Sequence, residues 1–136
     1  MPSMTKARRQ QLLELAPVAH LATVGPDGLP ELVPICFALL DDTIWTAIDQ
    51  KPKRTQELRR LENIRREPRV RILIDRYDDD WSQLWWIRLQ GEASIVVARA
   101  QPIEALCQKY PPYGLDPPTG AVIEIKITAW SSWSAS

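Results

Sequence analysis

A stretch rich in arginine and lysine, residues 49–71, contains the side chains that could most readily bind a ligand. It holds nine Lys or Arg residues and four Asp or Glu residues, whereas the whole chain has 17 of each and no net charge. Lys51, Lys53 and Arg54 stand together where a predicted strand gives way to a predicted helix. The free N–H groups and dipole of a helix N-terminus favour an anion, and three cations strengthen that preference. The cluster therefore predicts a phosphate site.

Two other interpretations of the basic stretch stay open. On a helix from Thr55 to Glu67, the charged side chains would point outward and pair partly with one another, so the helix would meet only solvent. Nucleic acid would need basic residues spread along a face, with aromatic side chains among them to stack on bases. The aromatic residues lie elsewhere in this chain. A small phosphorylated ligand is therefore favoured over nucleic acid.

No conventional catalytic residue is visible in the sequence. It has no nucleophile elbow, Walker loop or dinucleotide-binding glycine motif. His20, the one histidine, lies in an apolar strand pattern and is interpreted as a satisfied structural residue, and Cys36 as a small buried hydrophobe. The acidic run Asp78–Asp80 is interpreted as a solvated turn. We expect no metal site and leave the catalytic residues unassigned, so a redox cofactor would bring the chemistry.

The composition is typical of a globular protein. The 136 residues fit one domain, residues 1–136, with 45% hydrophobic and 25% charged residues. Cys36 and Cys107 have no paired spacing and are expected to be reduced thiols. No apolar run reaches the roughly 18 residues that suggest a membrane span. We therefore expect a cytoplasmic protein with no membrane partner.

The first part of the chain predicts a helix and three strands. Thr5 is expected to cap a helix with Leu12 and Leu15 on one face, which ends before Pro17. The segments "VAHLATV" and "LPELVPICFALL" flank a Pro-Asp-Gly turn and predict a hairpin, whose prolines put its second strand at a sheet edge or give it a bulge. A turn at Asp41 and Asp42 leads into "TIWTAID", a third strand. We expect these strands to form an antiparallel meander.

The rest of the chain predicts further strands and short helices. The Thr55–Glu67 helix is expected to carry its apolar side chains at Leu58, Leu61 and Ile64. Strands are predicted at "VRILID", at "LWWIRLQGEASIVV" with a bend or bulge at Gly91, and at "AVIEIKITAW". A helix is predicted at "PIEALCQKY" and an extended connector at "YPPYGLDPPTG". Strands joined mostly by hairpins, with two or three short helices, indicate a small antiparallel barrel.

The order of these segments resembles the split β-barrel proteins of the pyridoxamine 5'-phosphate oxidase-like superfamily, which bind flavins and deazaflavins. The resemblance is carried by "ATVGPDGLPELVPICFAL", "TIWTAIDQKPKRTQELRRLENIRREPRVRILID" and "WWIRLQGEASIV", in that order. The segments "YDDDWSQLWWIRL" and "VIEIKITAWSSWSA" look like its branch of coenzyme F420-dependent enzymes. Covering about residues 15–134, the resemblance implies a mainly β (α+β) fold, a six-stranded antiparallel split β-barrel with two to three short helices.

The resemblance also implies a homodimer with two cofactor sites at the subunit interface. In such proteins the residues after the third strand hold the cofactor phosphate, which here are Lys51, Lys53 and Arg54. The strand before them would run its backbone along the ring system at Thr46, Ala47 and Ile48. The ring's other side would be lined by Val33, Pro34, Ile35, Cys36 and Phe37. The partner subunit would supply Trp85, Trp86, Arg88, Trp130 and Trp133, for which plain packing at the dimer interface stays an equal alternative.

The function implied by the resemblance is hydride transfer between F420 and a small conjugated acceptor. The tryptophan-rich C-terminal part and the small size favour F420 over FMN, although one basic cluster could serve either cofactor. Spare cations such as Arg59, or Arg8 and Arg9, could meet the polyglutamate tail of F420. Two rivals stay open: an FMN-dependent oxidase or reductase of the same fold, and a carrier that binds flavin or F420 without turnover.

Overall fold

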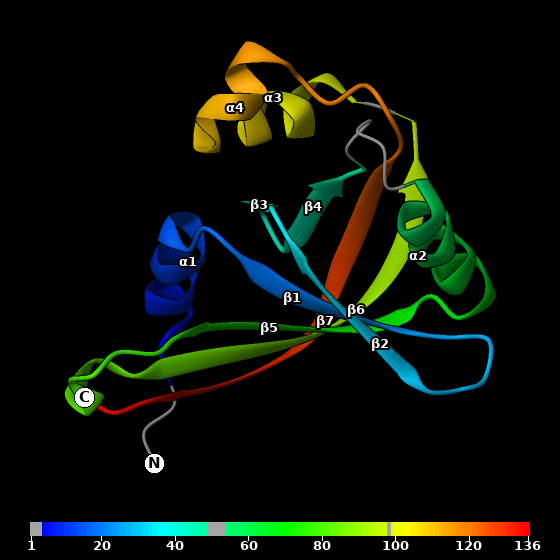
Figure 1. Ribbon diagram of the computed structural model, residues 1–136. Coiled ribbons are helices and arrows are strands. Elements are labelled where there is room, and N and C mark those ends of the chain that lie inside the picture. The colour runs from blue at the N-terminus through cyan, green and yellow to red at the C-terminus, as the bar shows by residue number, and fades with distance from the viewer. Residues whose placement is uncertain (1–3, 49–53, 98) are drawn as a thin grey trace.

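The computed structural model describes residues 4–48, 54–97 and 99–136, and in the helix that begins at Arg54 it describes side chains from residue 59 onward. An antiparallel sheet forms its centre, and the described strands follow the order β2-β1-β5-β6-β7-β4-β3 (Figure 1). Their bounds are β1 (Ala19–Val24), β2 (Pro30–Ile35), β3 (Ala38–Leu40), β4 (Thr43–Ala47), β5 (Arg69–Arg76), β6 (Trp85–Val96) and β7 (Val122–Ser134).

The passage from β2 to β3 forces this sheet to curl. The two strands lie at opposite edges of the sheet, yet only Cys36 and Phe37 separate them in the sequence. Three Cα–Cα steps span at most about 11 Å, so the two edges must come close together. The predicted split barrel is confirmed, with seven strands among the described residues because the expected second strand is divided in two.

This division also makes the predicted three-strand meander wrong. The hairpins β1–β2 and β3–β4 form as expected, but β4 continues the sheet by pairing with β7. Between the hairpins, the backbone N–H of Phe37 donates to the hydroxyl of Tyr110 (3.0 Å) instead of to a neighbouring strand. The predicted edge position of the proline-containing strand is confirmed, since β2 ends the sheet.

The barrel interior is filled by aliphatic side chains from alternating positions of the central strands. The fully buried residues on these strands include Leu21, Ile44, Ile72, Ile74, Ile87, Leu89, Ile123 and Ile125. Gly91 is needed where β6 approaches β7 most closely, because a Cβ there would lie 2.6 Å from Cγ2 of Ile125. The pairing register shifts between Gln90 and Gly91, which confirms the predicted bulge.

Helix α1 (Lys6–Leu15) begins where the sequence predicts. The hydroxyl of Thr5 accepts a hydrogen bond from the N–H of Arg8 (3.1 Å) and so caps the helix. The predicted apolar face is wrong in part, because Leu13 is the fully buried residue whereas Leu15 is exposed. Leu12 is half-buried against the core, so the face that packs is centred one residue away from the one expected.

Helix α2 (Arg54–Arg66) lies beside the barrel and contacts β1 and β6 (Figure 1). It begins one residue before the predicted cap Thr55, and Leu61 and Ile64 are buried as expected. Its third buried residue is polar: Asn63 keeps only 1% of its surface exposed. A polar side chain that is this deeply buried needs hydrogen-bond partners, and these define the site described below.

The remaining helices cover the top of the barrel in the view of Figure 1. Helix α3 (Ala100–Lys109) is followed at once by α4 (Pro111–Leu115), so the predicted extended connector is wrong over those five residues. A 3-10 turn, η1 (Trp81–Gln83), follows the acidic run. Strand β7 continues to Ser134, beyond the predicted end at Trp130, and so includes Trp133. Within the described residues no helix has the length and apolar character needed to cross a membrane.

Candidate cofactor-binding site

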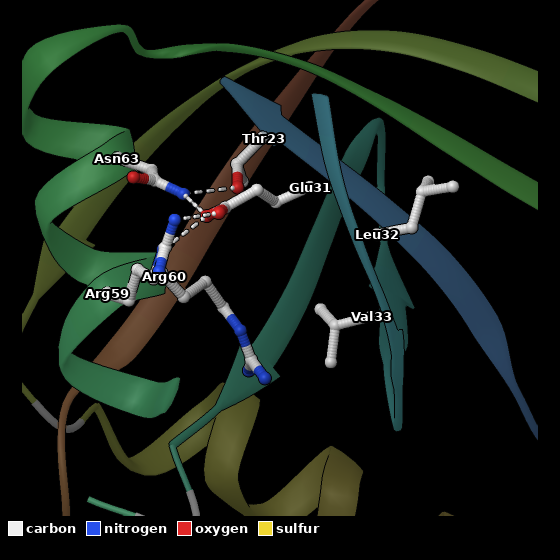
Figure 2. Close-up of a pocket in the computed structure, with 7 residues that line it drawn as sticks. All are labelled: Thr23, Glu31, Leu32, Val33, Arg59, Arg60 and Asn63. Atoms are coloured by element: carbon white, nitrogen blue, oxygen red, sulfur yellow. Dashed lines mark hydrogen bonds and ion pairs between the residues drawn. The ribbon is translucent and has the colours of Figure 1, made fainter. Parts of the chain in front are cut away.

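A pocket of about 300 Å³ lies between helix α2 and the hairpin formed by β1 and β2. Figure 2 shows its lining residues, which come from β1, β2 and α2: Thr23, Glu31, Leu32, Val33, Arg59, Arg60 and Asn63. One wall is apolar and the helix wall carries two arginines. A volume of this size is at the low end for small-molecule pockets, so it would enclose part of a cofactor.

Asn63 organises the polar end of this pocket. Its amide Nδ2 donates to the hydroxyl of Thr23 (3.1 Å) and to Oε1 of Glu31 (2.6 Å). Its Oδ1 accepts from Nη2 of Arg66 (3.0 Å), which also donates to the carbonyl of Val24 (2.8 Å). Both ends of the amide are thereby satisfied, and α2 is tied to the hairpin β1–β2.

Glu31 is held as a carboxylate within this network. Arg59 donates from Nε to Oε1 of Glu31 (3.0 Å), and its Nη2 lies 2.5 Å from Oε2. The hydrogen bond from Asn63, together with Arg59, lowers the pKa of Glu31 below its ordinary value of 4.5. Glu31 therefore carries a negative charge near neutral pH, and it keeps 32% of its side chain exposed.

The two pocket arginines have different surroundings. Arg59 is engaged by Glu31, whereas the side chain of Arg60 extends along the pocket away from that carboxylate, on the side of Val33 (Figure 2). Arg59 was expected as a spare cation, whereas no sequence pattern indicated that Glu31, Arg60 and Asn63 belong to the same site.

Of the three residues predicted to hold the phosphate, one falls among the described residues. Lys51 and Lys53 are outside the described residues, and Arg54 begins the helix, although its side chain is not described. In β4 and just after it, Thr46, Ala47 and Ile48 are buried as whole residues in the single chain. The prediction that this backbone runs along the ring stays a prediction.

The five residues from Val33 to Phe37 lie in different environments. Val33 lines the pocket, whereas Ile35 and Phe37 are buried in the core. Pro34 is exposed, and Cys36 is half-buried at the passage between β2 and β3. Alternation along a strand sends successive side chains to opposite faces, so at most part of this segment could face one ligand through side chains.

The C-terminal candidates lie away from the pocket, and none of them lines it. Trp86 and Trp133 are register partners on β6 and β7, and the guanidinium carbon of Arg88 lies 5.1 Å from the centroid of the Trp86 ring. Trp85 is buried in the core, and Trp130 is half-buried below Arg9, whose guanidinium carbon lies 4.8 Å from the ring centroid.

Trp86 and Trp133 belong to an apolar patch on the outer face of the sheet. The register aligns Pro34, His20, Leu73 and Arg88 across four strands. Leu73 is 40% exposed and Leu32, on the same face of β2, is 74% exposed. The interpretation of His20 as a satisfied residue is wrong for Nδ1, which is buried and has no hydrogen-bond partner among the described residues.

A second polar cluster lies under α3, next to Cys36 and Phe37. The Tyr110 hydroxyl accepts from the N–H of Phe37 and donates to one carbonyl at a time, that of Pro17 (2.9 Å) or Phe37 (3.2 Å). The ammonium of Lys109 donates to the carbonyl of Leu13 (3.1 Å) and lies 3.7 Å from the centroid of the Phe37 ring. Burial lowers the pKa of Lys109 to about 8 and raises that of Tyr110 to about 12.

Comparison with solved structures relates this fold to proteins of several functions. A conserved hypothetical protein from Mycobacterium tuberculosis has a TM-score of 0.77 and 23% identity, over 97% of this chain and 86% of that one. An FAD-binding protein from Mesorhizobium loti has a TM-score of 0.71 and 18% identity, over 96% and 95% of the two chains. An F420 reductase has a TM-score of 0.67 and 24% identity, over 90% and 94%.

The sequence itself assigns the family. No curated protein matches it. The family model described as pyridoxamine 5'-phosphate oxidase matches residues 5–134, which is nearly the whole chain. The described segments from α1 to β7 all fall within that match. The chain therefore belongs to the pyridoxamine 5'-phosphate oxidase family.

Proposed function

We propose that this protein is an F420-dependent reductase that acts on a small conjugated acceptor. The observation that carries the proposal is the pocket along α2, which is lined by Arg59 and Arg60. In the sequence these two arginines come shortly after the predicted phosphate cluster of Lys51, Lys53 and Arg54. The similarity to an F420 reductase supports this choice of cofactor. When bound, the reduced deazaflavin would supply the hydride.

The donor set of the described pocket fits the charged side chain of such a cofactor. Arg60 offers a guanidinium to a phosphate, and the Val33 side of the pocket offers an apolar wall. The pocket is too small for a complete flavin or deazaflavin with its chain, which fits a site completed by a second subunit. Lys51, Lys53 and Arg54 would bind the phosphate, and the backbone at Thr46, Ala47 and Ile48 would orient the ring.

An FMN-dependent enzyme or a carrier without turnover is the second candidate. The similarity to an FAD-binding protein favours a flavin as the ligand. Within the described pocket lining, Glu31 is the one acidic group, and its lowered pKa keeps it from serving as a proton donor near neutral pH. A site without a proton donor suits a carrier as well as an enzyme in which solvent provides the proton.

The binding test is a titration of the purified protein with F420 and FMN, followed by quenching of the fluorescence of its six tryptophans. Saturation by F420 together with consumption of reduced F420 by enones or quinones would support the reductase. Saturation without turnover would favour the carrier, and tight binding of FMN alone would move the protein to the flavin-dependent alternative. Binding of neither cofactor would contradict the proposal.

Lys53→Ala is expected to weaken cofactor binding by about tenfold or more, because the phosphate would lose a charge-assisted partner. The same titration measures the effect. Arg65→Ala is the matched control, since Arg65 is exposed on α2 and does not line the pocket. An equal loss in both variants would indicate a diffuse electrostatic surface in place of a defined phosphate site.

We also propose that the apolar patch on the outer sheet face is the interface of a homodimer. Leu32 and Leu73 are exposed on this face, and Trp86 and Trp133 lie on the same face towards β7. Exposed leucines and tryptophans are typical of an interface core. A second copy covering this face would bring its own tryptophans close to the first copy. This arrangement agrees with the dimer that the family resemblance implies.

Leu73→Asp is expected to convert the dimer to a monomer, because it would replace an apolar contact of the interface by a charged side chain that must lose its water. Light scattering coupled to size-exclusion chromatography would report the mass, and cofactor affinity should fall in parallel. Leu115→Asp is the matched control: it introduces the same charge at a leucine of α4 that is even more exposed. Should Leu73→Asp remain dimeric, this face is not the interface.

A further inference from the structure

Glu31 is an acidic residue in a pocket whose other charged lining residues, within the described part of the chain, are the arginines Arg59 and Arg60. A pocket that simply attracts an anion would gain nothing from a carboxylate. Glu31 also keeps about a third of its side chain exposed, so its charge faces the space that a ligand would enter. Its presence there calls for a reason other than packing.

The position of this carboxylate is fixed by the structure around it. Asn63 approaches Oε1 at 2.6 Å and is itself held by Thr23 and Arg66, so it cannot turn away without losing two other hydrogen bonds. Arg59 approaches both oxygens. A side chain held from two directions does not move aside readily when an anion enters the pocket.

We propose that Glu31 is a specificity-determining residue, which shifts the preference of the site from doubly charged phosphomonoesters towards singly charged phosphodiesters. The inference rests on the proposed function, because it concerns the phosphate of the cofactor bound there. FMN carries a monoester, whereas F420 joins its chain to the next group through a diester. A fixed negative charge repels a phosphate that carries two negative charges more strongly than a phosphate that carries one.

The size of this effect follows from simple electrostatics. Two unit charges about 7 Å apart, at an effective dielectric constant of about 40, change a binding constant by about three- to tenfold. The charged groups that act on Glu31 are Arg59 from α2, which contacts it, and Asp27 from the turn between β1 and β2. Arg60 lines the same pocket but extends away from the carboxylate, and Arg66 reaches it only through Asn63 (Figure 2). Glu31 stays ionised throughout the pH range of the test because its pKa is lowered.

The experiment compares two ligands that differ by one charge. For the ring system that the wild-type protein binds, riboflavin or the deazaflavin, the probes are its 5'-phosphate and the methyl ester of that phosphate. The ratio of their dissociation constants at pH 7.5 is measured for the wild type and for Glu31→Gln and Glu31→Ala. Both neutral variants are expected to shift the ratio about three- to tenfold in favour of the monoester. Glu31→Asp keeps the charge and should leave the ratio near the wild-type value.

Two controls separate charge from shape. Glu62→Gln removes the same charge from an exposed position of α2 and should not change the ratio. At pH 5 the monoester also carries one charge, because its second pKa is about 6, so the effect of Glu31→Gln should largely vanish. Thermal unfolding of each variant checks that it is folded. Glu31→Gln keeps one acceptor oxygen, which can still accept from Nδ2 of Asn63 and Nε of Arg59, whereas the contact of Nη2 with the second oxygen is lost.

The outcomes are distinct for the inference and for the proposed function. If the wild type binds one of the ring systems and the neutral variants change both affinities equally, the inference is wrong and the proposed function stands. A ratio shift that persists at pH 5 also overturns the inference, since it would come from shape. If neither ring system binds to the wild type, both are wrong.

Discussion

Two polar clusters fasten helices to the barrel, and they do so with different chemistry. At α2, Asn63 joins Glu31, Thr23 and Arg66 through side chains, with Arg59 completing the set beside an open pocket. At α3, Tyr110 and Lys109 bond chiefly to backbone groups at the strand passage and at the end of α1. The second cluster shares no residue with the pocket at α2.

This difference separates a structural anchor from a candidate binding site. Backbone groups left without a ladder partner must be satisfied, and a single tyrosine hydroxyl does this at Phe37. A half-exposed ion pair such as Arg59–Glu31 contributes little to stability, roughly 0–1 kcal/mol. The charges at α2 therefore matter more for what the pocket binds, whereas Asn63 matters for both.

Asn63→Ala is the substitution that should break the α2 cluster most severely. It removes the donor to Thr23 and Glu31 and leaves a buried space, which is expected to lower the free energy of unfolding by about 2–4 kcal/mol. Urea denaturation measures the change, and the cofactor titration should show weaker binding. Gln108→Ala, at an exposed site on α3, should change stability by less than about 0.5 kcal/mol. A loss as small as that of the control would mean that the network does not hold α2.

Tyr110→Phe tests the other cluster and should have a smaller effect. It leaves the N–H of Phe37 without its hydroxyl partner, which is expected to lower the free energy of unfolding by about 1–2 kcal/mol. Cofactor affinity should stay unchanged, in contrast to Asn63→Ala. The matched control is Tyr77→Phe, because the Tyr77 side chain is exposed. Should Tyr110→Phe weaken the cofactor, the cluster under α3 would also belong to the site.

The features that could be predicted from the sequence are those set by neighbouring residues. The Thr5 cap lies within one turn of its partner Arg8, and the bulge at Gly91 follows from the missing side chain. Both were confirmed. The mainly β barrel also follows from local alternation and turns, because hairpins connect residues that are close in the sequence.

What could not be predicted depends on residues far apart in the chain. The break at Phe37 depends on Tyr110, 73 residues later, and the pocket depends on Glu31 and Asn63, 32 residues apart. No local pattern encodes such pairs. Helix α4 was missed for a different reason: prolines, which suit the first turn of a helix, were interpreted as an extended connector.

The smallest expected effect concerns the charge of Lys109 and appears only as a dependence on pH. Burial lowers the pKa of Lys109 from its ordinary value of 10.5 to about 8, although the Leu13 carbonyl and the Phe37 ring both favour the ammonium form. Between these two values the unfolded chain retains a proton that the folded chain has released. The unfolded state therefore binds more protons, so this group makes the protein more stable as pH rises from about 8.

Lys109→Met should remove that rise. Because the side chain is only about half-buried, the expected gain in the free energy of unfolding between pH 7.5 and 9.5 is about 1 kcal/mol in the wild type relative to the variant. The raised pKa of Tyr110 acts in the opposite direction, but between about pH 10 and 12, outside the range measured. Urea denaturation at the two pH values gives the difference, with Lys6→Met at an exposed ion pair as the control. Parallel behaviour of the wild type and Lys109→Met would mean that the ammonium is not destabilised by burial, and the cluster under α3 would then tolerate charge as well as the one at α2 does.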